Sequence, residues 1–213
     1  MKIVTCILAR GGSKGIPRKN IIDLNGKPLL SYTIGASINS NVNETWVSTE
    51  DAEIKKVALS YGAQVIDRPK ELAEDFSRNE DSLLDFANHV DFDILVMIQA
   101  TSPLLTAKYI NIGLSKMLTG QYDSVFSVCR EHWVPRWTLD IQPVSWSPYH
   151  RHHRQEVPEQ FIENGAFYIT SREALLESKL RYSGKMDVVE MPFSESLQVD
   201  NLDELKVISK LLK

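Results

Sequence analysis

Two nearly unbroken apolar runs constrain the fold of this chain more than any other feature. The first is KIVTCILA (2–9) and the second is DILVMIQ (93–99). Neither run alternates polar and apolar positions, as a strand with one solvent-exposed face would. Both therefore predict strands that are buried on both faces, as in the centre of a parallel sheet covered by helices.

Strand and helix patterns alternate around these two runs. Apolar residues at i, i+3, i+4 and i+7 from Ile54 predict an amphipathic helix over 51–62, which ends at Gly62. Further strands are predicted at 45–49, 63–67, 124–128, 165–170 and 186–191, and further helices at 27–40, 79–90, 106–120 and 201–213. Residue Thr106 is the expected cap of the third of these helices. The alternation predicts an α/β fold with a Rossmann-like, doubly wound, mostly parallel sheet.

The alternation stops between residues 129 and 161. This stretch holds three of the four Trp, four of the five His and four Pro, and it has no helical period. The pattern resumes at 165–170. We interpret the chain as a single domain, 1–213, from which 129–161 protrudes as an arm.

The charge balance bears on the partners of the chain. It has 28 Asp and Glu against 24 Lys and Arg, which gives a net charge of −4. That balance favours neither nucleic acid nor a membrane surface as a partner. Cys6 and Cys129 each lie in an apolar run, which indicates reduced core thiols. The N-terminus is typical of a first strand and not of a signal peptide, so we expect a cytoplasmic protein.

A glycine-rich loop, LARGGSKGIPRKN (8–20), follows the first apolar run. Its cations are Arg10, Lys14, Arg18 and Lys19, and its glycines are Gly11, Gly12 and Gly15. A loop in this position lies at the carboxyl edge of the sheet, where open α/β folds bind ligands. The glycine spacing matches neither the P-loop nor the dinucleotide motif. Backbone amides and four cations suit a nucleoside triphosphate, and the alternative is a solvated basic turn.

The loop resembles the signature of the acylneuraminate cytidylyltransferase family, the CMP-sialic acid synthetases and their relatives for other nonulosonic acids. Four more segments match in family order: RPKELAED (68–75), IQATSPL (98–104), RQEVPEQFIENGAFYI (154–169) and LQVDNLDEL (197–205). The resemblance implies a fold of the nucleotidyltransferase type. It also implies an enzyme that joins CMP from CTP to the anomeric hydroxyl of an acidic 2-keto sugar, releases pyrophosphate and uses Mg²⁺.

The resemblance assigns the phosphate-binding residues to the glycine loop. Arg10, Ser13 and Lys14 would hold the β- and γ-phosphates within the cradle that includes Gly11. Lys19 would lie against the α-phosphate. Arg10, Lys14 and Lys19 would be the catalytic residues, because fixed cations stabilise the charge that develops on the phosphate oxygens as pyrophosphate leaves.

The nucleoside would be held by a second group of residues. Backbone groups of Leu8, Ala9 and Arg10 would read the edge of the cytosine, and Asn20 and Arg68 would lie near the nucleoside. An ion pair at the surface is the alternative for Arg68.

The sugar would be held by residues from two of the matching segments. Gln99 would hydrogen-bond the sugar, and its alternative role is to satisfy the backbone of its own loop. Arg154 would receive the sugar carboxylate as a bidentate guanidinium partner. Asn164 and Tyr168 match pocket residues of the family, and the alternative for Tyr168 is an aromatic residue of the core.

Three positions depart from the family pattern around the sugar. Ala100 and Leu105 stand where the family usually has proline and arginine, and Ile162 stands where some members have a second arginine. These departures leave the identity of the acceptor sugar open.

The metal site also departs from the family, which often has two aspartates in a D-x-D pattern before its last helix. Here Gln198 replaces the first of them and Asp200 remains. Asp200 is the predicted Mg²⁺ ligand, since Mg²⁺ often takes one or two carboxylates and completes its shell with phosphate oxygens and water. The alternative is that Asp200 caps the last helix, with Asp203 completing a partial capping box.

The arm corresponds in the family to a segment that reaches across a homodimer and closes the site of the partner subunit. Trp133, Trp137 and Trp146 would be buried at that interface, and the alternative is that they cover the sheet of their own chain. Two other functions remain open at this point. One is a cytidylyltransferase for the eight-carbon sugar acid Kdo, and the other is a nucleotide-sugar-binding protein without catalytic activity.

Overall fold

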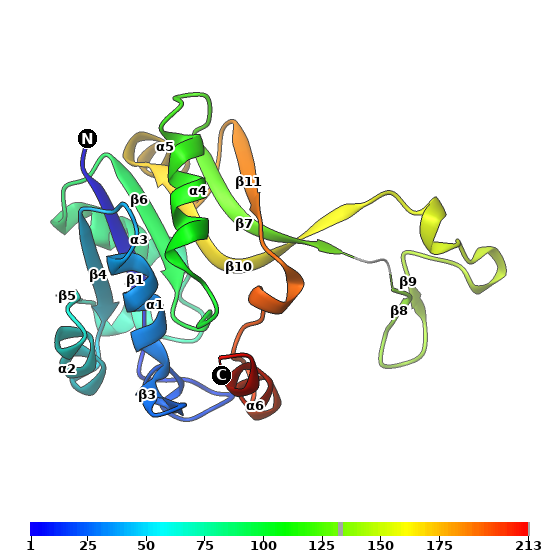
Figure 1. Cartoon of the computed structure of the whole chain (residues 1–213), viewed down its shortest axis with the longest axis horizontal. Coiled ribbons are helices and arrows are strands. Elements are labelled where there is room, and N and C mark those ends of the chain that lie inside the picture. The colour runs from blue at the N-terminus through cyan, green and yellow to red at the C-terminus, as the bar shows by residue number, and fades with distance from the viewer. Residues whose placement is uncertain (132–133, 213) are drawn as a thin grey trace.

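The structure, a computed structural model, describes residues 1–131 and 134–212, without the side chain of Arg154. Its centre is a seven-stranded sheet in the order β11-β7-β10-β6-β1-β4-β5 (Figure 1). The strands are β1 (Ile3–Leu8), β4 (Glu44–Thr49), β5 (Gln64–Asp67), β6 (Ile94–Gln99), β7 (Ser124–Glu131), β10 (Gln160–Ser171) and β11 (Met186–Glu190). The two apolar runs form β1 and β6, which lie in the interior of the sheet as predicted and pair with each other.

Neighbouring strands are parallel except around β10, which runs antiparallel to both β6 and β7. The prediction of an α/β fold with a mostly parallel sheet is confirmed. Strand β10 is twice as long as the predicted 165–170, and its register shifts between Glu163 and Tyr168. Such a bulge re-aims the backbone locally, here next to the candidate site.

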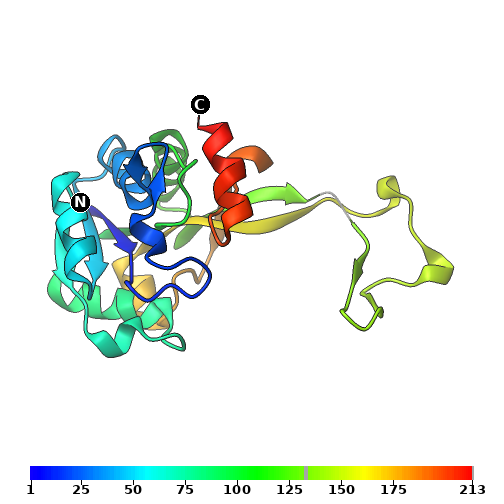
Figure 2. The ribbon, with the colours of Figure 1, turned by 90° about the horizontal axis from the view of Figure 1, so that it is seen from below.

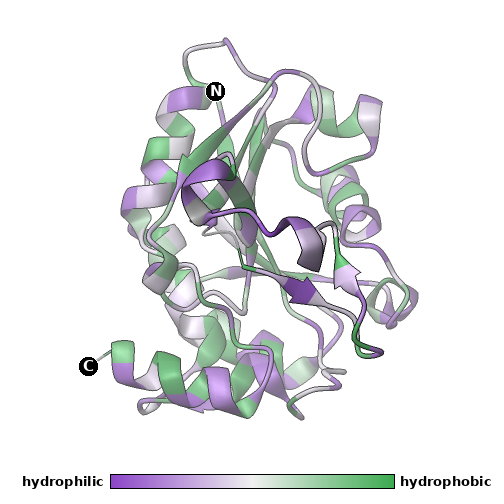
Figure 3. Cartoon of the chain, turned by 90° about the vertical axis from the view of Figure 1, so that its right-hand side faces the viewer, coloured by the Kyte–Doolittle hydropathy of each residue, from purple (hydrophilic) through white to green (hydrophobic). Residues whose placement is uncertain are grey.

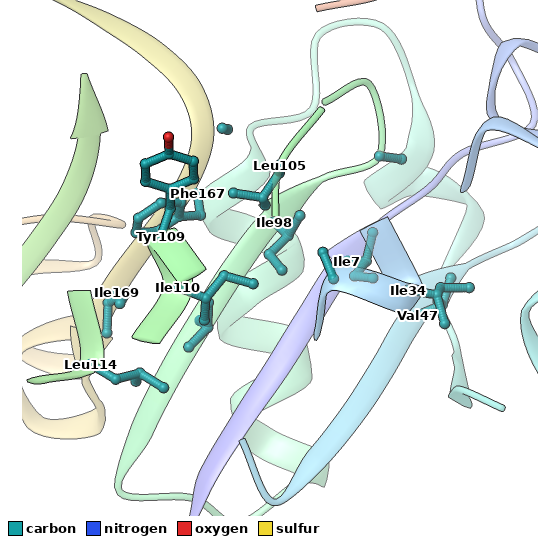
Figure 4. Packing of buried hydrophobic residues seen from close by; sticks show 14 of the residues in the cluster. Ile7, Ile34, Val47, Ile98, Leu105, Tyr109, Ile110, Leu114, Phe167 and Ile169 are labelled. Carbon is teal, nitrogen blue, oxygen red and sulfur yellow. The ribbon is translucent and has the colours of Figure 1, made fainter. Parts of the chain in front are cut away.

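Helices cover both faces of the sheet. One face carries α1 (Leu29–Ile38), α2 (Ala52–Ser60) and α4 (Ala107–Met117), and the other carries α3 (Asn79–His89) and α5 (Arg172–Ser178). On the first face, Ile98 and Phe167 of the sheet lie beside Ile110 of α4, and Ile7 and Val47 lie beside Ile34 of α1 (Figure 4). The apolar residues of β1 and β6 are thus buried by two separate layers of helices.

The helix predictions differ from the structure mainly at their ends. Helix α5 was not predicted, because its seven residues are too few to show a period. Thr106 occupies the N-cap position of α4, but its side chain makes no capping hydrogen bond. Within the described ranges, no helix is both long and apolar enough to cross a membrane.

The last helix, α6 (Leu202–Leu211), packs away from the main sheet, against the short hairpin β2 (Asp23–Leu24) and β3 (Lys27–Pro28). Ile208 of α6 is buried in a small cluster with Leu24, Leu29 and Ile16. Figure 3 shows α6 with hydrophobic and hydrophilic residues on the same helix, as expected for an element with one buried face. Cys6 and Cys129 are free and buried, as predicted.

The arm extends away from the body of the molecule in two perpendicular views (Figures 1 and 2). Beyond the ends of β7 and β10, the chain forms the small pair β8 (Arg136–Trp137) and β9 (Pro143–Val144). Trp137 lies edge-on to Trp146, with ring centroids 4.9 Å apart, and Leu139 and Tyr149 are exposed. The arm tryptophans therefore do not cover the sheet of their own chain, and Trp133 lies outside the described residues.

Candidate active site

Strands β1 and β6 end at the same edge of the sheet, with Leu8 opposite Gln99. The glycine loop leaves this edge after β1, and a cavity of about 450 Å³ opens beside it. Among the predicted site residues, those that line the cavity are Leu8, Arg10, Ser13, Lys14, Lys19, Asn20, Arg68, Gln99 and Asp200. The fold thus brings four distant segments of the sequence into one cavity, at the edge where the strand pattern predicted a site.

Two of the loop cations share one acidic partner. The Lys14 ammonium lies 2.8 Å from Asp75, and the Arg10 guanidinium lies 3.2 Å from the other carboxylate oxygen of Asp75. Arg10 also donates to the Ala73 carbonyl at 3.2 Å. The hydrogen bond from Lys14 holds the pKa of Asp75 below its ordinary value. A carboxylate thus occupies an anion position between the two cations that were predicted to hold phosphates.

Lys19 reaches the cavity from the short 3₁₀ helix Lys19–Ile21, and its ammonium lies 2.9 Å from Asp200. Lys19 is mostly buried, with 16% of its side chain exposed, whereas the Asp200 side chain is 64% exposed. Gly15 lies close to the backbone of Asp200. A Cβ atom at Gly15 would come within 2.7 Å of the Asp200 carbonyl oxygen, so the close approach requires glycine.

Arg18, the fourth cation of the loop, is not in the cavity lining. Its backbone is left-handed, with φ 57°, and its guanidinium pairs with Asp51 and Glu53 around α2. Asp51 is the N-cap of α2 and accepts the amides of Glu53 and Ile54 at 3.0 Å each. The hydrogen bond from Arg18 lowers the pKa of Asp51 to about 2. Arg18 therefore ties the loop to α2, and three loop cations remain for a ligand.

Glu50 connects the loop to Arg68. One of its carboxylate oxygens accepts the Gly11 amide at 2.7 Å, and the other lies 3.2 Å from Arg68. The alternative for Arg68 was an ion pair at the surface. Arg68 is buried, so its pair with Glu50 is not a surface pair. Among the described residues, the Arg68 Nε atom is buried without a hydrogen-bond partner. A buried guanidinium nitrogen is costly to leave unpaired, and Arg68 also lines the cavity.

Some backbone groups near the predicted cytosine position already form hydrogen bonds within the protein. The Ala9 amide donates to the Ser48 carbonyl at 3.1 Å, and the Arg10 carbonyl accepts the Asn20 side-chain amide at 2.8 Å. Asn20 is buried, so it fixes the path of the loop through this bond. Ala9 and Gly11 do not line the cavity. At Gly11, a Cβ atom would come within 2.6 Å of the Asp51 carboxylate.

Gln99 lines the cavity and is linked to Gln198. The Gln198 Nε2 atom lies 3.2 Å from Gln99 Oε1, 3.1 Å from Ser102 Oγ and 2.8 Å from the Asn164 carbonyl oxygen. The Asn164 side chain is used internally, since it donates to Ser196 at 2.9 Å and accepts the Ala166 amide at 3.1 Å. Asn164 therefore lies behind Gln198 and is not in the cavity lining.

The remaining two predicted sugar residues are Tyr168 and Arg154. Tyr168 is buried among Met97 and Phe86 in the core between the sheet and α3. Its hydroxyl donates to Glu163, and burial followed by this bond raises the pKa of Tyr168. Its surroundings match the alternative of a core aromatic residue. The side chain of Arg154 lies outside the described residues.

The residues around Asp200 allow the Mg²⁺ prediction to be tested for chemical fit. Asn201 caps α6 and Glu204 completes the capping box, so the alternative that Asp200 and Asp203 form the cap is wrong. No cluster of three or more His, Cys, Asp or Glu side chains able to hold a metal occurs in the described part of the chain. One exposed carboxylate fits Mg²⁺ that keeps water and phosphate oxygens as its other ligands.

Four residues that shape the site were absent from the sequence predictions or had no assigned role: Glu50, Asp51, Asp75 and Gln198. Glu50 and Asp51 follow directly after β4, at the same carboxyl edge as the loop. The rule that ligands bind at the carboxyl ends of parallel strands could have found them. Nothing local in the sequence marks Asp75 as a partner of Lys14, and Gln198 was noted only as a missing carboxylate.

Comparison with known proteins gives a consistent result. A family model described as "Cytidylyltransferase" matches residues 4–188. The chain is 41% identical to N-acylneuraminate cytidylyltransferase A of Danio rerio over 93% of this chain and 48% of that protein. It is 31% identical to pseudaminic acid cytidylyltransferase of Campylobacter jejuni, over 100% of this chain and 97% of that protein. The chain thus spans about half the length of the Danio rerio relative and nearly all of the Campylobacter one.

A solved structure is similar over its whole length. It is a CMP:2-keto-3-deoxy-manno-octonic acid synthetase complexed with CTP, with a TM-score of 0.77 and 17% identity, covering 100% of this chain and 98% of that one. At that identity the similarity shows the fold alone.

Proposed function

This chain belongs to the cytidylyltransferase family, and from that membership we propose that it transfers CMP from CTP to the anomeric hydroxyl of a nonulosonic 2-keto sugar acid, with release of pyrophosphate. The observation that carries the proposal is the convergence of Arg10, Lys14 and Lys19 in one cavity with Gln99. The cations suit a triphosphate, and the amide at the end of β6 suits a sugar.

The cations act on the charge that builds up during transfer. Attack on the α-phosphorus increases negative charge on its oxygens and on the departing pyrophosphate. Lys19, fixed in the cavity wall, neutralises charge at the α-phosphate. Arg10, Ser13 and Lys14 hold the β- and γ-phosphates and stabilise the leaving group. Once the triphosphate is bound, these donors already contact its oxygens, so little reorganisation is needed when the charge develops.

Asp75 has to leave its cations for this to happen. It occupies the anion position that the phosphates take, and its pairs are solvent-accessible, so they are weak, about 0.2–1 kcal/mol for an exposed ion pair. A triphosphate carries more charge and more acceptor oxygens than one carboxylate, so it displaces Asp75.

Asp200 is the residue that would hold Mg²⁺ in this site. Bound Mg²⁺ would neutralise phosphate charge and orient the triphosphate. Asp200 itself contributes a carboxylate at the cavity wall and keeps the Lys19 ammonium beside it.

The acceptor is proposed to be a sialic-acid-like sugar. The named relatives at 31–41% identity act on N-acylneuraminate or pseudaminic acid, judged by their names. The Kdo alternative is not favoured, since the similarity to the Kdo synthetase is one of fold. Gln99 would contact the sugar, Asn164 supports that contact from behind, and Arg154 is proposed to receive the carboxylate. Tyr168 would act on the sugar side only through the residues that it packs against.

We also propose that two chains form a homodimer through the arm. Exposed apolar side chains on the arm, including Leu139, Ile141 and Tyr149, would be buried against a second copy. Sedimentation of the chain and of a variant with these three residues changed to serine tests this: the wild type should sediment as a dimer and the variant as a monomer.

A cytoplasmic location stays a prediction, which fractionation of cells that express a tagged chain tests.

The experiment for the proposed activity is an assay of pyrophosphate release. The purified chain is incubated with Mg²⁺, each of the four nucleoside triphosphates and a panel of 2-keto sugar acids that differ in N-acyl pattern and stereochemistry. We expect release with CTP and at least one nonulosonic acid, and none with Kdo. Binding of CTP without release for any sugar would instead support a nucleotide-sugar-binding protein without catalytic activity.

A further inference from the structure

Gln198 stands where the family pattern has a metal carboxylate, yet its side chain points its amide nitrogen at three oxygen atoms. The contact with the Asn164 carbonyl, at 2.8 Å, fixes the orientation of this amide. A backbone carbonyl can only accept, so the Gln198 atom that faces it has to be the NH₂ group. A carboxylate at this position would face the Asn164 carbonyl, which cannot donate a hydrogen bond to it.

The same contact fixes the orientation of Gln99. With one hydrogen directed at Asn164, the other hydrogen of the Gln198 amide is shared between Gln99 Oε1 and Ser102 Oγ. Gln99 therefore turns its oxygen to Gln198. In the described part of the chain no protein atom accepts a hydrogen bond from Gln99 Nε2, and Gln99 lines the cavity.

The backbone is shaped to permit this arrangement. Gly165 has φ +70°, which glycine adopts without strain, and a Cβ atom there would come within 2.8 Å of Gln198 Nε2. Gly165 lies in the irregular part of β10, where the register shifts between Glu163 and Tyr168. The bulge thus turns the Asn164 carbonyl toward Gln198 and leaves room for its amide.

We propose that Gln198 is a positioning residue for sugar recognition: it holds Gln99 so that the Gln99 NH₂ group is presented to the cavity as a hydrogen-bond donor. This inference rests on the proposed function. It defines the ligand group that Gln99 contacts as a hydrogen-bond acceptor of the sugar acid. Two candidate acceptors are a carboxylate oxygen and the oxygen of an N-acyl carbonyl.

The test compares KM for the sugar acid and for CTP in Gln198→Met. Methionine has similar length but no amide, so Gln99 loses its fixed orientation while the phosphate cations stay unchanged. We expect KM for the sugar to rise about tenfold, the effect of losing one good hydrogen bond, with KM for CTP within twofold of the wild-type value. Gln121→Met, at an exposed position after α4, is the matched control and should leave both values unchanged.

A double-mutant cycle separates positioning from a general loss of structure. If Gln198 acts through Gln99, then adding Gln198→Met to Gln99→Met raises the sugar KM no further. Additive effects of the two substitutions would overturn the proposal, as would an equal rise of both KM values in Gln198→Met. Absence of pyrophosphate release by the wild-type chain would overturn the proposed function, and this inference with it.

The two possible sources of the acceptor oxygen are distinguished with one pair of sugars. An N-acylated sugar acid is compared with the form that has a hydroxyl in place of the N-acyl group. A KM increase confined to the N-acylated form assigns the acceptor to the N-acyl carbonyl. An equal increase for both forms assigns it to an oxygen that they share, such as a carboxylate oxygen.

Discussion

The Lys14 ammonium lies 2.8 Å from Asp75, a carboxylate on a different loop. Asp75 thus competes with any phosphate that Lys14 and Arg10 bind. We expect Asp75→Asn to bind CTP about two- to fivefold more tightly, the range that corresponds to losing an exposed ion pair. Isothermal titration calorimetry at fixed Mg²⁺ measures this. Glu74→Gln removes the neighbouring exposed charge and should leave the affinity unchanged. Weaker binding of CTP by Asp75→Asn would show that Asp75 supports the site.

Substitutions of Lys14 and Arg18 should affect different properties: the first CTP binding, and the second stability. Lys14→Ala removes a cavity cation and should weaken CTP binding about tenfold, with little change in stability. Arg18→Gln breaks the pairs with Asp51 and Glu53. It should lower the free energy of unfolding by about 1 kcal/mol and leave CTP affinity within twofold. Calorimetric titration and urea denaturation of both variants check the two properties. Equal loss of affinity in both would place Arg18 among the phosphate ligands.

The pair of Arg18 with Asp51 should make stability depend on pH in a defined window. The folded protein holds the pKa of Asp51 at about 2, below its ordinary value of 3.8, so the unfolded chain takes up the proton more readily. The stability from this carboxylate is present above about pH 4 and is lost as pH falls toward 2. Asp51→Asn keeps a capping side chain but loses the charge. It should cost about 1 kcal/mol at pH 7, and the difference from wild type should shrink between pH 4 and pH 2.

Urea denaturation at pH 7, 4 and 3 follows this difference for Asp51→Asn. A difference that stays constant over the whole range would mean that the charge of Asp51 contributes nothing to stability.

Asp200 should set the Mg²⁺ requirement. Asp200→Asn replaces the carboxylate with a neutral amide, so about tenfold more Mg²⁺ should be needed for half-maximal pyrophosphate release. Asp203→Asn is the matched control, because Asp203 is exposed on α6 and pairs with Lys206. An unchanged Mg²⁺ curve in Asp200→Asn would leave Asp200 as the partner of Lys19 alone.

The parts of the fold that depend on local pattern were predictable. The apolar runs of β1 and β6 identified the centre of the sheet, and their shared carboxyl edge located the cavity beside Leu8 and Gln99. The antiparallel direction of β10 was not predictable in this way. An apolar strand has the same residue pattern whichever way it runs, so its direction follows from the connections and not from its own sequence.

The parts of the site that depend on contacts between distant segments were not predictable. Along the sequence, Arg18 and Lys19 are adjacent cations with equal claim to a phosphate. The left-handed backbone at Arg18 sends the two side chains to different partners, Asp51 and Asp200. In the same way, the sequence shows Gln198 only as the replacement of a carboxylate. Its hydrogen bonds to Gln99 and to the Asn164 carbonyl depend on the fold.

The glycine loop passes so close to the segment that leads into α6 that a Cβ atom at Gly15 would meet the Asp200 carbonyl oxygen. Lys19 of the loop pairs with Asp200. In the hairpin that follows the loop, the Asn25 side-chain amide donates to the Ser209 carbonyl of α6 at 2.8 Å. Opening of the loop would therefore break its contacts with the segment that leads into α6. Amide hydrogens of the loop and of α6 should then exchange with solvent through one common opening, which makes the two a single cooperative unit.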